Sequence, residues 1–147
     1  MIAKPFRKIL TRTIKPALDV STSIDRVMPV RKLRCSAARR APGGGGINVA
    51  RVLKRLGAEV TALFPAGGST GDLLGRLVAG EGVNSIKAPI AGETRENFTV
   101  NETENLEQFR FVLAGPILAM AEWQHCLDML AEQGLSLIPI SGPTDPY

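Results

Sequence analysis

The sequence is organised around the run Ala41-Pro42-Gly43-Gly44-Gly45-Gly46-Ile47-Asn48-Val49-Ala50-Arg51. Glycine adopts backbone angles that other residues avoid, and it lets a ligand approach the main chain. The residues after the glycines have helical spacing, and a helix N-terminus offers unpaired N–H groups with a partial positive charge. The run therefore predicts a cradle for a polar or anionic small molecule at the start of a helix.

Two common nucleotide-binding motifs do not fit this run. A Walker A loop needs Lys and then Ser or Thr after its last glycine, whereas Ile47 and Asn48 follow here. The dinucleotide fingerprint needs glycine or alanine where Val49 stands. The patterned helix that follows at once also disfavours a merely flexible connector. Asn48, in the first helical turn, can instead hydrogen-bond a polyol.

Length and composition indicate a globular protein. The 147 residues suggest one domain or a piece of one, with 44% hydrophobic and 22% charged residues. No apolar run approaches the ~20 residues of a membrane helix, and the basic start lacks the apolar core of a secretory signal. Cys35 and Cys126 lack CxxC spacing, so we expect reduced, buried thiols in a cytoplasmic protein. A lone His125 disfavours a catalytic triad or a zinc site and favours a packing or surface role.

The net charge of +4 includes one local basic cluster, formed by Arg31, Lys32, Arg34, Arg39 and Arg40. Nucleic-acid binding would favour stacking aromatic residues beside such a cluster, and none lies within it. An anionic small-molecule substrate is the better use of these side chains. A solvated basic strand is the structural alternative.

Hydrophobic periodicity predicts alternating strands and helices, which is typical of a parallel sheet. Strands are expected over 8–14, over 59–64 and near Ile86. The helix after the glycine run should end at Gly57, and a second helix should follow Ser69, which is placed to cap it. The apolar faces predicted for these helices are Val49, Val52, Leu53 and Leu56 in the first, and Leu73, Leu74, Leu77 and Val78 in the second.

Other segments break this rhythm and predict a small second sheet. Pro16 should end the first strand and leave Asp19 in the turn after it. Alternation over 32–37 predicts a strand with one apolar and one basic face, and 93–112 reads as a hairpin that joins it in an antiparallel flap. A third helix is expected over 118–132, with a strand over 135–140. The apolar face predicted for that helix is Met120, Trp123, Leu127 and Leu130.

The glycine run resembles the N-terminal signature of the PfkB (ribokinase-like) sugar kinases. Lys15-Pro16-Ala17-Leu18-Asp19 resembles their first strand and turn, which carries a substrate-binding Asp. Several further segments are similar to the minor 6-phosphofructokinase branch of that family, and the similarity covers about residues 8–137. These segments are Lys32-Leu33-Arg34-Cys35, Phe64-Pro65-Ala66-Gly67-Gly68, Gly71, Thr94-Arg95-Glu96-Asn97 and Phe109-Arg110-Phe111.

The resemblance implies an α/β fold, with a mainly parallel sheet, flanking helices and a small antiparallel β lid. Residues 1–147 would form the N-terminal, substrate-binding half of the kinase domain, with lid segments near 20–40 and 93–113. The implied reaction is transfer of the ATP γ-phosphoryl group, with Mg²⁺, to the 1-hydroxyl of fructose 6-phosphate in glycolysis. A 1-phosphofructokinase or a tagatose-phosphate kinase is the nearby alternative.

The resemblance also implies a set of site residues. Asp19, Gly44, Gly45 and Asn48 would hold sugar hydroxyls. Lys32, Arg34 and Arg95 would hold the 6-phosphate, within one chain or across a homodimer formed through the lid. Arginine suits this role because its planar donors match phosphate oxygens.

Part of the family pattern does not occur in the sequence. The catalytic Asp of the family lies in a Gly-Ala-Gly-Asp motif, which is absent from the 147 residues, as is the nucleotide-binding half. We therefore expect an inactive N-terminal fragment, produced by early termination or a change of reading frame. A non-catalytic sugar-phosphate-binding or dimerisation module is the second hypothesis, and a poorly folding product is the third.

Overall fold

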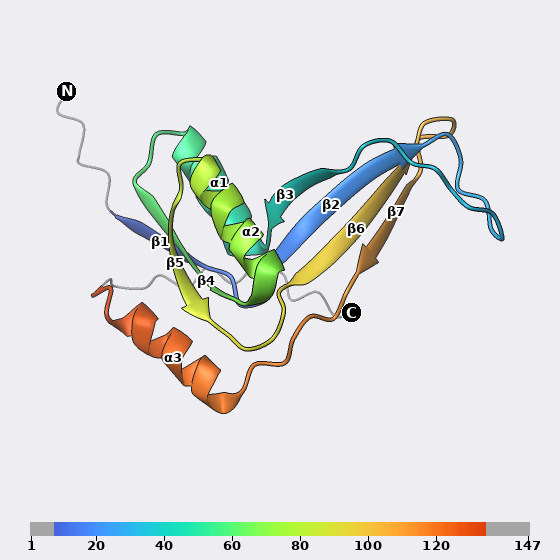
Figure 1. The fold of residues 1–147 in the computed structure, drawn as a ribbon. Helices are drawn as coiled ribbons and strands as arrows, with labels where there is room; N and C mark the ends of the chain where they lie inside the picture. Colours follow the sequence, from blue (N-terminus) through green and yellow to red (C-terminus); the bar gives the residue numbers. More distant parts are fainter. Residues whose placement is uncertain (1–7, 135–147) are drawn as a thin grey trace, which may run out of the picture.

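A computed structural model describes residues 8–134, which form two β-sheets and three helices (Figure 1). The body sheet has the order β1-β4-β5 and the lid sheet has the order β3-β2-β6-β7. The body strands are β1 (Ile9–Arg12), β4 (Val60–Ala66) and β5 (Asn84–Pro89). The lid strands are β2 (Ala17–Ile24), β3 (Arg39–Gly43), β6 (Arg95–Glu102) and β7 (Gln108–Val112).

The body has three layers. Its strands are all parallel. Helices α1 (Gly45–Arg55) and α2 (Gly68–Gly80) cover one face, and α3 (Met120–Ala131) lies on the other (Figure 1). A parallel sheet is normally buried on both faces, and β4 shows this directly. Phe64 and the adjacent Leu63 are both fully buried although they point to opposite faces.

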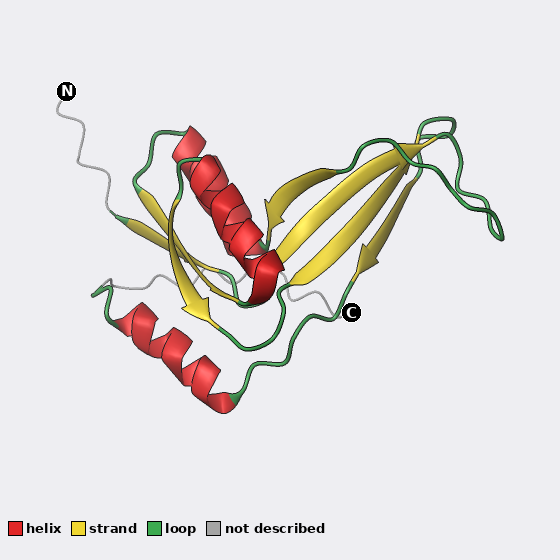
Figure 2. Cartoon of the chain, viewed as in Figure 1, coloured by secondary structure: helices red, strands yellow, loops and turns green. Residues whose placement is uncertain are grey.

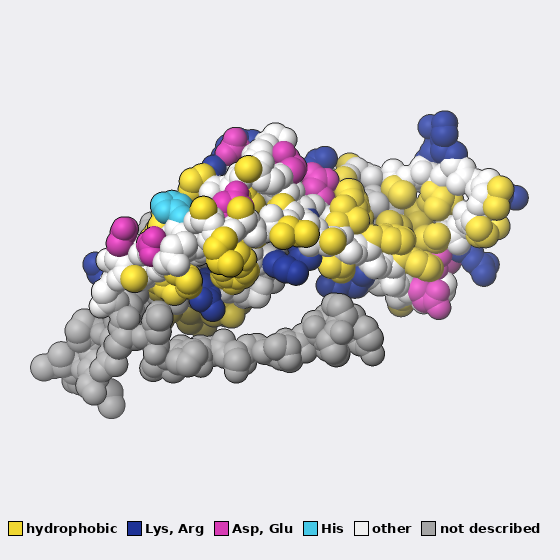
Figure 3. Space-filling view, turned by 90° about the horizontal axis from the view of Figure 1, so that it is seen from below, with side chains coloured by type: hydrophobic (Ala, Val, Ile, Leu, Met, Phe, Trp, Pro, Cys, Tyr) yellow, Lys and Arg dark blue, Asp and Glu magenta, His cyan; other side chains and the backbone are white. Residues whose placement is uncertain are grey.

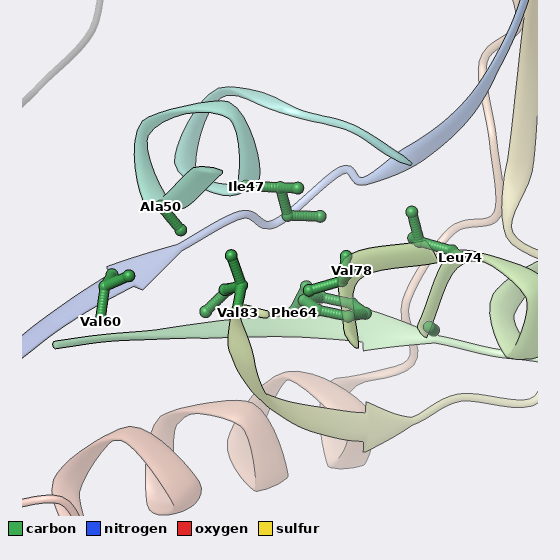
Figure 4. Close-up of a cluster of buried hydrophobic side chains, with 9 residues drawn as sticks. Ile47, Ala50, Val60, Phe64, Leu74, Val78 and Val83 are labelled. Atoms are coloured by element: carbon green, nitrogen blue, oxygen red, sulfur yellow. The ribbon is translucent and has the colours of Figure 1, made fainter. Parts of the chain in front are cut away.

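The core lies between β4 and the helices α1 and α2 (Figure 4). Phe64 is its largest fully buried side chain. The cluster consists of Ile47, Ala50, Val60, Ala62, Phe64, Ala66, Leu74, Val78 and Val83. On each helix the buried residues are spaced three or four apart, so they form one face. The second helix therefore has the predicted buried side, with Leu74 and Val78 at its centre.

The predicted buried face of α1 is confirmed only for Leu53, which packs against the core. Val49, Val52 and Leu56 are 47%, 53% and 72% exposed, whereas Ile47 and Ala50 are fully buried. The glycine run connects α1 to β3 at a fixed angle. This connection sets the rotation of the helix more strongly than its apolar periodicity does. The predicted face of α3 is also wrong, because Met120, Trp123 and Leu127 are exposed and Cys126 is buried instead.

The predicted capping role of Ser69 is wrong as well. The N-cap residue of α2 is Gly67, which has no capping side chain. Glu93, from the segment after β5, supplies the acceptor, and its Oε1 receives the Thr70 N–H at 2.7 Å. This hydrogen bond holds the pKa of Glu93 below its usual value. The N-terminus of α2 is thus already occupied by an anion of the protein itself.

The lid sheet is built from two insertions into the body. β2 and β3 lie between β1 and α1 in sequence, and β6 and β7 lie between β5 and α3 (Figure 2). The insertions meet where β2 runs parallel to β6, in register from Ala17 opposite Arg95 to Ile24 opposite Glu102. β3 and β7 pair antiparallel on the outer sides. The lid sheet is therefore mixed rather than antiparallel.

Two predictions about this region need correction. The strand predicted over 32–37 does not form, because β3, at 39–43, already pairs with the free edge of β2. Residues 25–38 connect the two strands instead, and residues 31–40 are exposed. Asp19 lies within β2 and not in a turn. Pro16 ends one strand, but the chain then begins another in the second sheet. The 93–112 hairpin is confirmed, although its partner is β2 and the pairing is parallel.

The remaining predictions have mixed outcomes. The first strand is shorter than predicted, and the strands at 60–66 and 84–89 are confirmed. Cys126 is buried as expected, but Cys35 is exposed, and both are free thiols. His125 lies on the surface. The predicted strand over 135–140 lies outside the described residues. None of the helices within 8–134 combines the length and apolar composition that crossing a membrane requires.

Candidate functional site

The glycine run lies where the lid meets the body. β3 ends at Gly43 and α1 begins at Gly45, so the run leads from the lid sheet into the first body helix. A Cβ atom at Gly43 would lie 2.2 Å from Oδ2 of Asp19. A Cβ atom at Gly46 would lie 2.3 Å from the carbonyl oxygen of Arg12. Both positions need glycine because neighbouring atoms approach the backbone so closely.

The two middle glycines have different environments. Gly44 has a φ of +121°, a conformation that side chains strongly disfavour. Gly45 is exposed, and a Cβ atom added there would meet no atom within 4 Å. The backbone at Gly45 is therefore open to approach from outside, whereas the glycines on either side are held by the fold.

A side chain from the body fixes the first turn of α1. The N-cap residue, Gly44, has no side chain to cap the helix. Instead, the buried Oγ1 of Thr13 accepts the Ile47 N–H at 2.9 Å. This bond satisfies one of the free N–H groups of the helix end and ties it to the connection between β1 and β2. It also fixes the turn that carries Asn48.

Asp19 lies beside the glycine run. Its partly buried carboxylate packs against the backbone of Gly43, and its Oδ1 accepts a hydrogen bond from Nδ2 of Asn97 at 3.1 Å. Asn97 stands directly opposite Asp19 on β6. The three residues come from three adjacent strands, so the lid sheet positions the carboxylate. The sequence analysis did not predict Asn97 as a site residue, although the alternation of polar and apolar residues around it indicates a strand.

The lid sheet has one polar and one apolar face, because side chains alternate along each strand. Residues directly opposite one another share a face. The polar face carries Asp19, Ser21, Arg39, Asn97, Thr99, Gln108 and Arg110. The other face, which we call the apolar face, carries Leu18, Val20, Phe98, Val100, Phe109 and Phe111, together with Thr22, Arg40 and Glu96. Arg110, which was not predicted as a site residue, thus shares the face of Asp19.

Asn48 is exposed in the first turn of α1. Its Oδ1 accepts a hydrogen bond from Nη1 of Arg51 at 3.2 Å, and the same nitrogen donates to the carbonyl of Pro42 at 3.1 Å. Arg51 also forms a 2.6 Å ion pair with Glu81. Its hydrogen bond to the carboxylate holds the pKa of Glu81 below the usual value. Arg51 therefore orients the Asn48 amide, whose NH₂ group is left to donate.

Arg95 begins β6 at the base of the lid sheet. Its Nη1 donates to the carbonyl of Leu113 at 3.0 Å and its Nη2 to the carbonyl of Lys15 at 3.2 Å. Its Nε is buried without a hydrogen-bond partner within residues 8–134. The guanidinium thus joins the start of β2 to the end of β7. Two surface hollows include Arg95 in their linings, and neither includes Asp19 or the glycine run.

Lys32 and Arg34 lie apart from the other predicted site residues. Both are exposed in the connection between β2 and β3, which extends beyond the far end of the lid sheet (Figure 1). From Asp19 to Ile24, the last residue of β2, is five residue steps, which span about 17 Å in a strand. The structure therefore places Asp19 against Gly43 of the glycine run, and Asn48 follows that run in the first turn of α1. Within one chain, Lys32 and Arg34 therefore lie away from Asp19 and the glycine run.

Comparison with known proteins identifies the family. The model for pfkB family carbohydrate kinases matches residues 17–137, and the chain belongs to this family. The chain is 52% identical to the ATP-dependent 6-phosphofructokinase isozyme 2 of Mycobacterium tuberculosis, over 95% of this chain and 42% of that protein. It is 40% identical to the Escherichia coli protein of the same name, over 95% of this chain and 45% of that protein. A 1-phosphofructokinase from Xanthomonas campestris is 34% identical over 83% of this chain and 38% of its own length.

Solved structures confirm the ribokinase-like α/β fold. A crystal structure of phosphofructokinase-2 from Escherichia coli in complex with fructose-6-phosphate superposes with a TM-score of 0.82. It is 42% identical, and the match covers 85% of this chain and 41% of that chain. The chain thus spans less than half the length of the relatives that it matches.

Proposed function

We propose that this chain forms the sugar-phosphate-binding side of a 6-phosphofructokinase-type site. The observation that carries the proposal is the Asp19 carboxylate, set against Gly43 and oriented by Asn97. A carboxylate accepts hydrogen bonds from sugar hydroxyls, the Asn48 amide donates one, and the open backbone at Gly45, next to Gly44, lets the sugar approach. The names of the Mycobacterium and Escherichia relatives support fructose 6-phosphate as the substrate.

In the proposed reaction, the C1 hydroxyl of fructose 6-phosphate gives its proton to a general base, and its oxygen attacks the γ-phosphorus of ATP. The bond to the β,γ-bridging oxygen breaks, and ADP leaves. The residues named above contribute by orienting the hydroxyl, which is a large part of catalysis in phosphoryl transfer. Mg²⁺ would neutralise phosphate charge, but residues 8–134 contain no cluster of three His, Cys, Asp or Glu side chains to hold it. We assign neither the metal site nor the catalytic base to this chain.

The chain should therefore bind the sugar phosphate without turning it over. Purified 147-residue chain, given ATP, Mg²⁺ and fructose 6-phosphate, should produce no ADP above the rate of a blank without enzyme. Measurable transfer would refute this part of the proposal. Sugar-phosphate binding without transfer would also fit the second hypothesis, a non-catalytic binding module. For both hypotheses we propose a cytoplasmic location.

Calorimetric titration with fructose 6-phosphate tests the site directly. Asp19→Ala should lower the affinity by about 10-fold to 100-fold, because hydrogen bonds to a charged group contribute about 1.5–3 kcal/mol. Arg76→Ala, on the exposed side of α2, is the matched control and should bind as the unmodified chain does. Equal affinity of the Asp19 variant and the control would refute the assignment. Tighter binding of fructose 1-phosphate or of a tagatose phosphate would favour the alternative substrates.

We further propose that two chains pair through the apolar face of the lid. Hydrophobic side chains gather on the lower surface of the molecule over the lid sheet (Figure 3). Phe98 and Phe111 on the apolar face are 39% and 54% exposed, an unusual amount for neighbouring aromatic residues of a sheet. Pairing would cover them, and it offers a way for Lys32 and Arg34 of one protomer to reach the sugar phosphate of its partner.

Sedimentation and mixing experiments test this arrangement. Phe98→Ser should shift the chain toward a monomer, and a variant that stays dimeric would contradict the proposed interface. A chain with Asp19→Ala and a chain with Lys32→Ala and Arg34→Ala should each bind weakly alone. Mixed, they should recover binding at one site per heterodimer, because one protomer supplies the carboxylate and the other the cations. No recovery on mixing would place all of these residues in one protomer.

A further inference from the structure

The connection between β2 and β3 combines dense positive charge with an exposed position, and Val27 is its one half-buried residue. We call residues 25–38 the basic loop, because it carries four cations and one acid. These residues are Arg26, Arg31, Lys32, Arg34 and the acid Asp25. Like charges this close in sequence repel, and an exposed segment of this kind tends to sample many conformations. A single conformation therefore needs contacts that hold the loop.

The first such contact is a buried carboxylate. Glu102, the last residue of β6, is 4% exposed and stands opposite Ile24 at the end of β2. Its Oε1 accepts the backbone N–H of Val27, three residues into the loop. Its Oε2 is buried and has no hydrogen-bond partner within residues 8–134. Burying a carboxylate is costly, and the charge-assisted bond to the loop is the contact that this carboxyl group makes.

The second contact lies at the other end of the loop. The backbone N–H of Ser36 donates to the Ser23 carbonyl at 2.9 Å, and the Ser36 hydroxyl accepts the Ser23 N–H at 3.1 Å. The Thr22 hydroxyl donates to the Ser36 carbonyl at 2.8 Å. Ser36 is thus fastened to two consecutive residues of β2. Val27 and Ser36 flank the segment that carries Lys32 and Arg34.

The tip of the loop shows that these contacts constrain it. Val30 has a φ of +62° and is fully exposed. A β-branched residue strongly disfavours this left-handed conformation, which costs of order 1–3 kcal/mol and persists only where the surroundings impose it. Nothing packs on the Val30 side chain. The constraint therefore comes through the backbone, from the anchored positions on either side.

We propose that Glu102 and Ser36 are positioning residues, which hold both ends of the basic loop so that Lys32 and Arg34 meet a sugar phosphate as a preformed pair. The inference rests on the proposed function of these two cations. Preorganisation strengthens binding because the ordering entropy of the loop is lost during folding and not during association. Neither positioning residue needs to touch the ligand.

Limited trypsin digestion of the full chain measures the anchoring without any ligand. Cleavage after Arg31, Lys32 and Arg34, followed by mass spectrometry, should be at least 10-fold faster in Glu102→Ala than in the unmodified chain. It should be more than 3-fold faster in Ser36→Ala, which removes the hydroxyl contacts of Ser36 but keeps its two main-chain hydrogen bonds. Glu102→Gln keeps an acceptor for the Val27 N–H and should stay within about 3-fold. Glu104→Ala removes an exposed acid two residues away and serves as the control. Unchanged cleavage in both alanine variants would overturn the proposal.

Titration with fructose 6-phosphate then measures the consequence. Glu102→Ala should bind about 10-fold more weakly and Ser36→Ala more than 3-fold more weakly, with Glu102→Gln close to the unmodified chain. Faster cleavage with unchanged affinity would overturn the positioning role. If Glu102→Ala does not fold, Ser36→Ala decides the matter, because its side chain lies in the exposed loop. If the unmodified chain binds no sugar phosphate, the proposed function and the positioning role both fail, while the cleavage rates still report whether the loop is anchored.

Discussion

Replacing Gly43 by alanine should destabilise the chain through one identifiable collision. The added Cβ would lie 2.2 Å, 2.5 Å and 2.7 Å from Oδ2, Cγ and Oδ1 of Asp19. Separations below about 3 Å are not tolerated, so the Asp19 side chain must move and lose its hydrogen bond from Asn97. Overpacking costs about 1–3 kcal/mol and lowers Tm by about 3 °C per kcal/mol in a chain of this size. Urea and thermal unfolding of Gly43→Ala should show this loss.

A double-mutant cycle identifies the collision as the cause. Gly43→Ala combined with Asp19→Gly removes the atoms that collide, so the pair should be more stable than the sum of the single effects by about 1–3 kcal/mol. Gly45→Ala is the matched control, because no atom lies within 4 Å of its added Cβ. Its stability should stay near that of the unmodified chain while sugar-phosphate affinity falls. Additive effects in the cycle would refute the inferred packing of Asp19 on Gly43.

Three further predictions follow from contacts in the body. Thr13→Val should lower the free energy of urea unfolding by about 1–3 kcal/mol, because it leaves the buried N–H of Ile47 in α1 unpaired. Thr11→Val is the control and should cost little, because the buried Thr11 hydroxyl has no partner within residues 8–134. Equal losses in the two variants would contradict the role of Thr13. Glu81→Gln should lower the free energy of unfolding by less than about 1 kcal/mol at pH 7, because the ion pair with Arg51 holds the folded-state pKa of Glu81 below the usual 4.5. The difference between the variant and the unmodified chain should fade as the pH falls below 4.5 and Glu81 becomes protonated. A difference that persists at pH 2 would argue against the ion pair. Iodoacetamide should modify the exposed Cys35 rapidly and Cys126 only upon unfolding, because burial shields that thiol and raises its pKa; equal rates would contradict the packing of α3.

The order of body elements could be predicted from the sequence because each depends on local signals. The glycine run predicts the start of α1, and the apolar stretch of β4 predicts a buried strand. The faces of α1 and α3 could not be predicted, because tertiary contacts fix helix rotation. Thr13 holds the first turn of α1 from 34 positions away, and nothing in the local pattern of Val49 and Val52 reports that bond.

The candidate site was only partly visible in the sequence. Asp19 and Gly44 were found through a resemblance, but the alternation of Leu18 and Val20 with polar residues, which marks β2, was overlooked in favour of the breaker Pro16. Asn97 could not be assigned without the parallel register that sets it opposite Asp19. Such pairings join distant segments, and single-strand periodicity carries no information on which strands become neighbours.

The parallel pairing of β2 with β6 also has a consequence for synthesis. Asp19 and Asn97 meet across 78 positions of the chain. At about 5–20 residues per second, a ribosome needs roughly 4–16 s after making β2 before its partner exists. During that interval the edge of β2 that later binds β6 stays unpaired and able to bind other strands. The lid sheet consequently cannot be completed until β6 and β7 have been made, and β2 is open to wrong pairing until then.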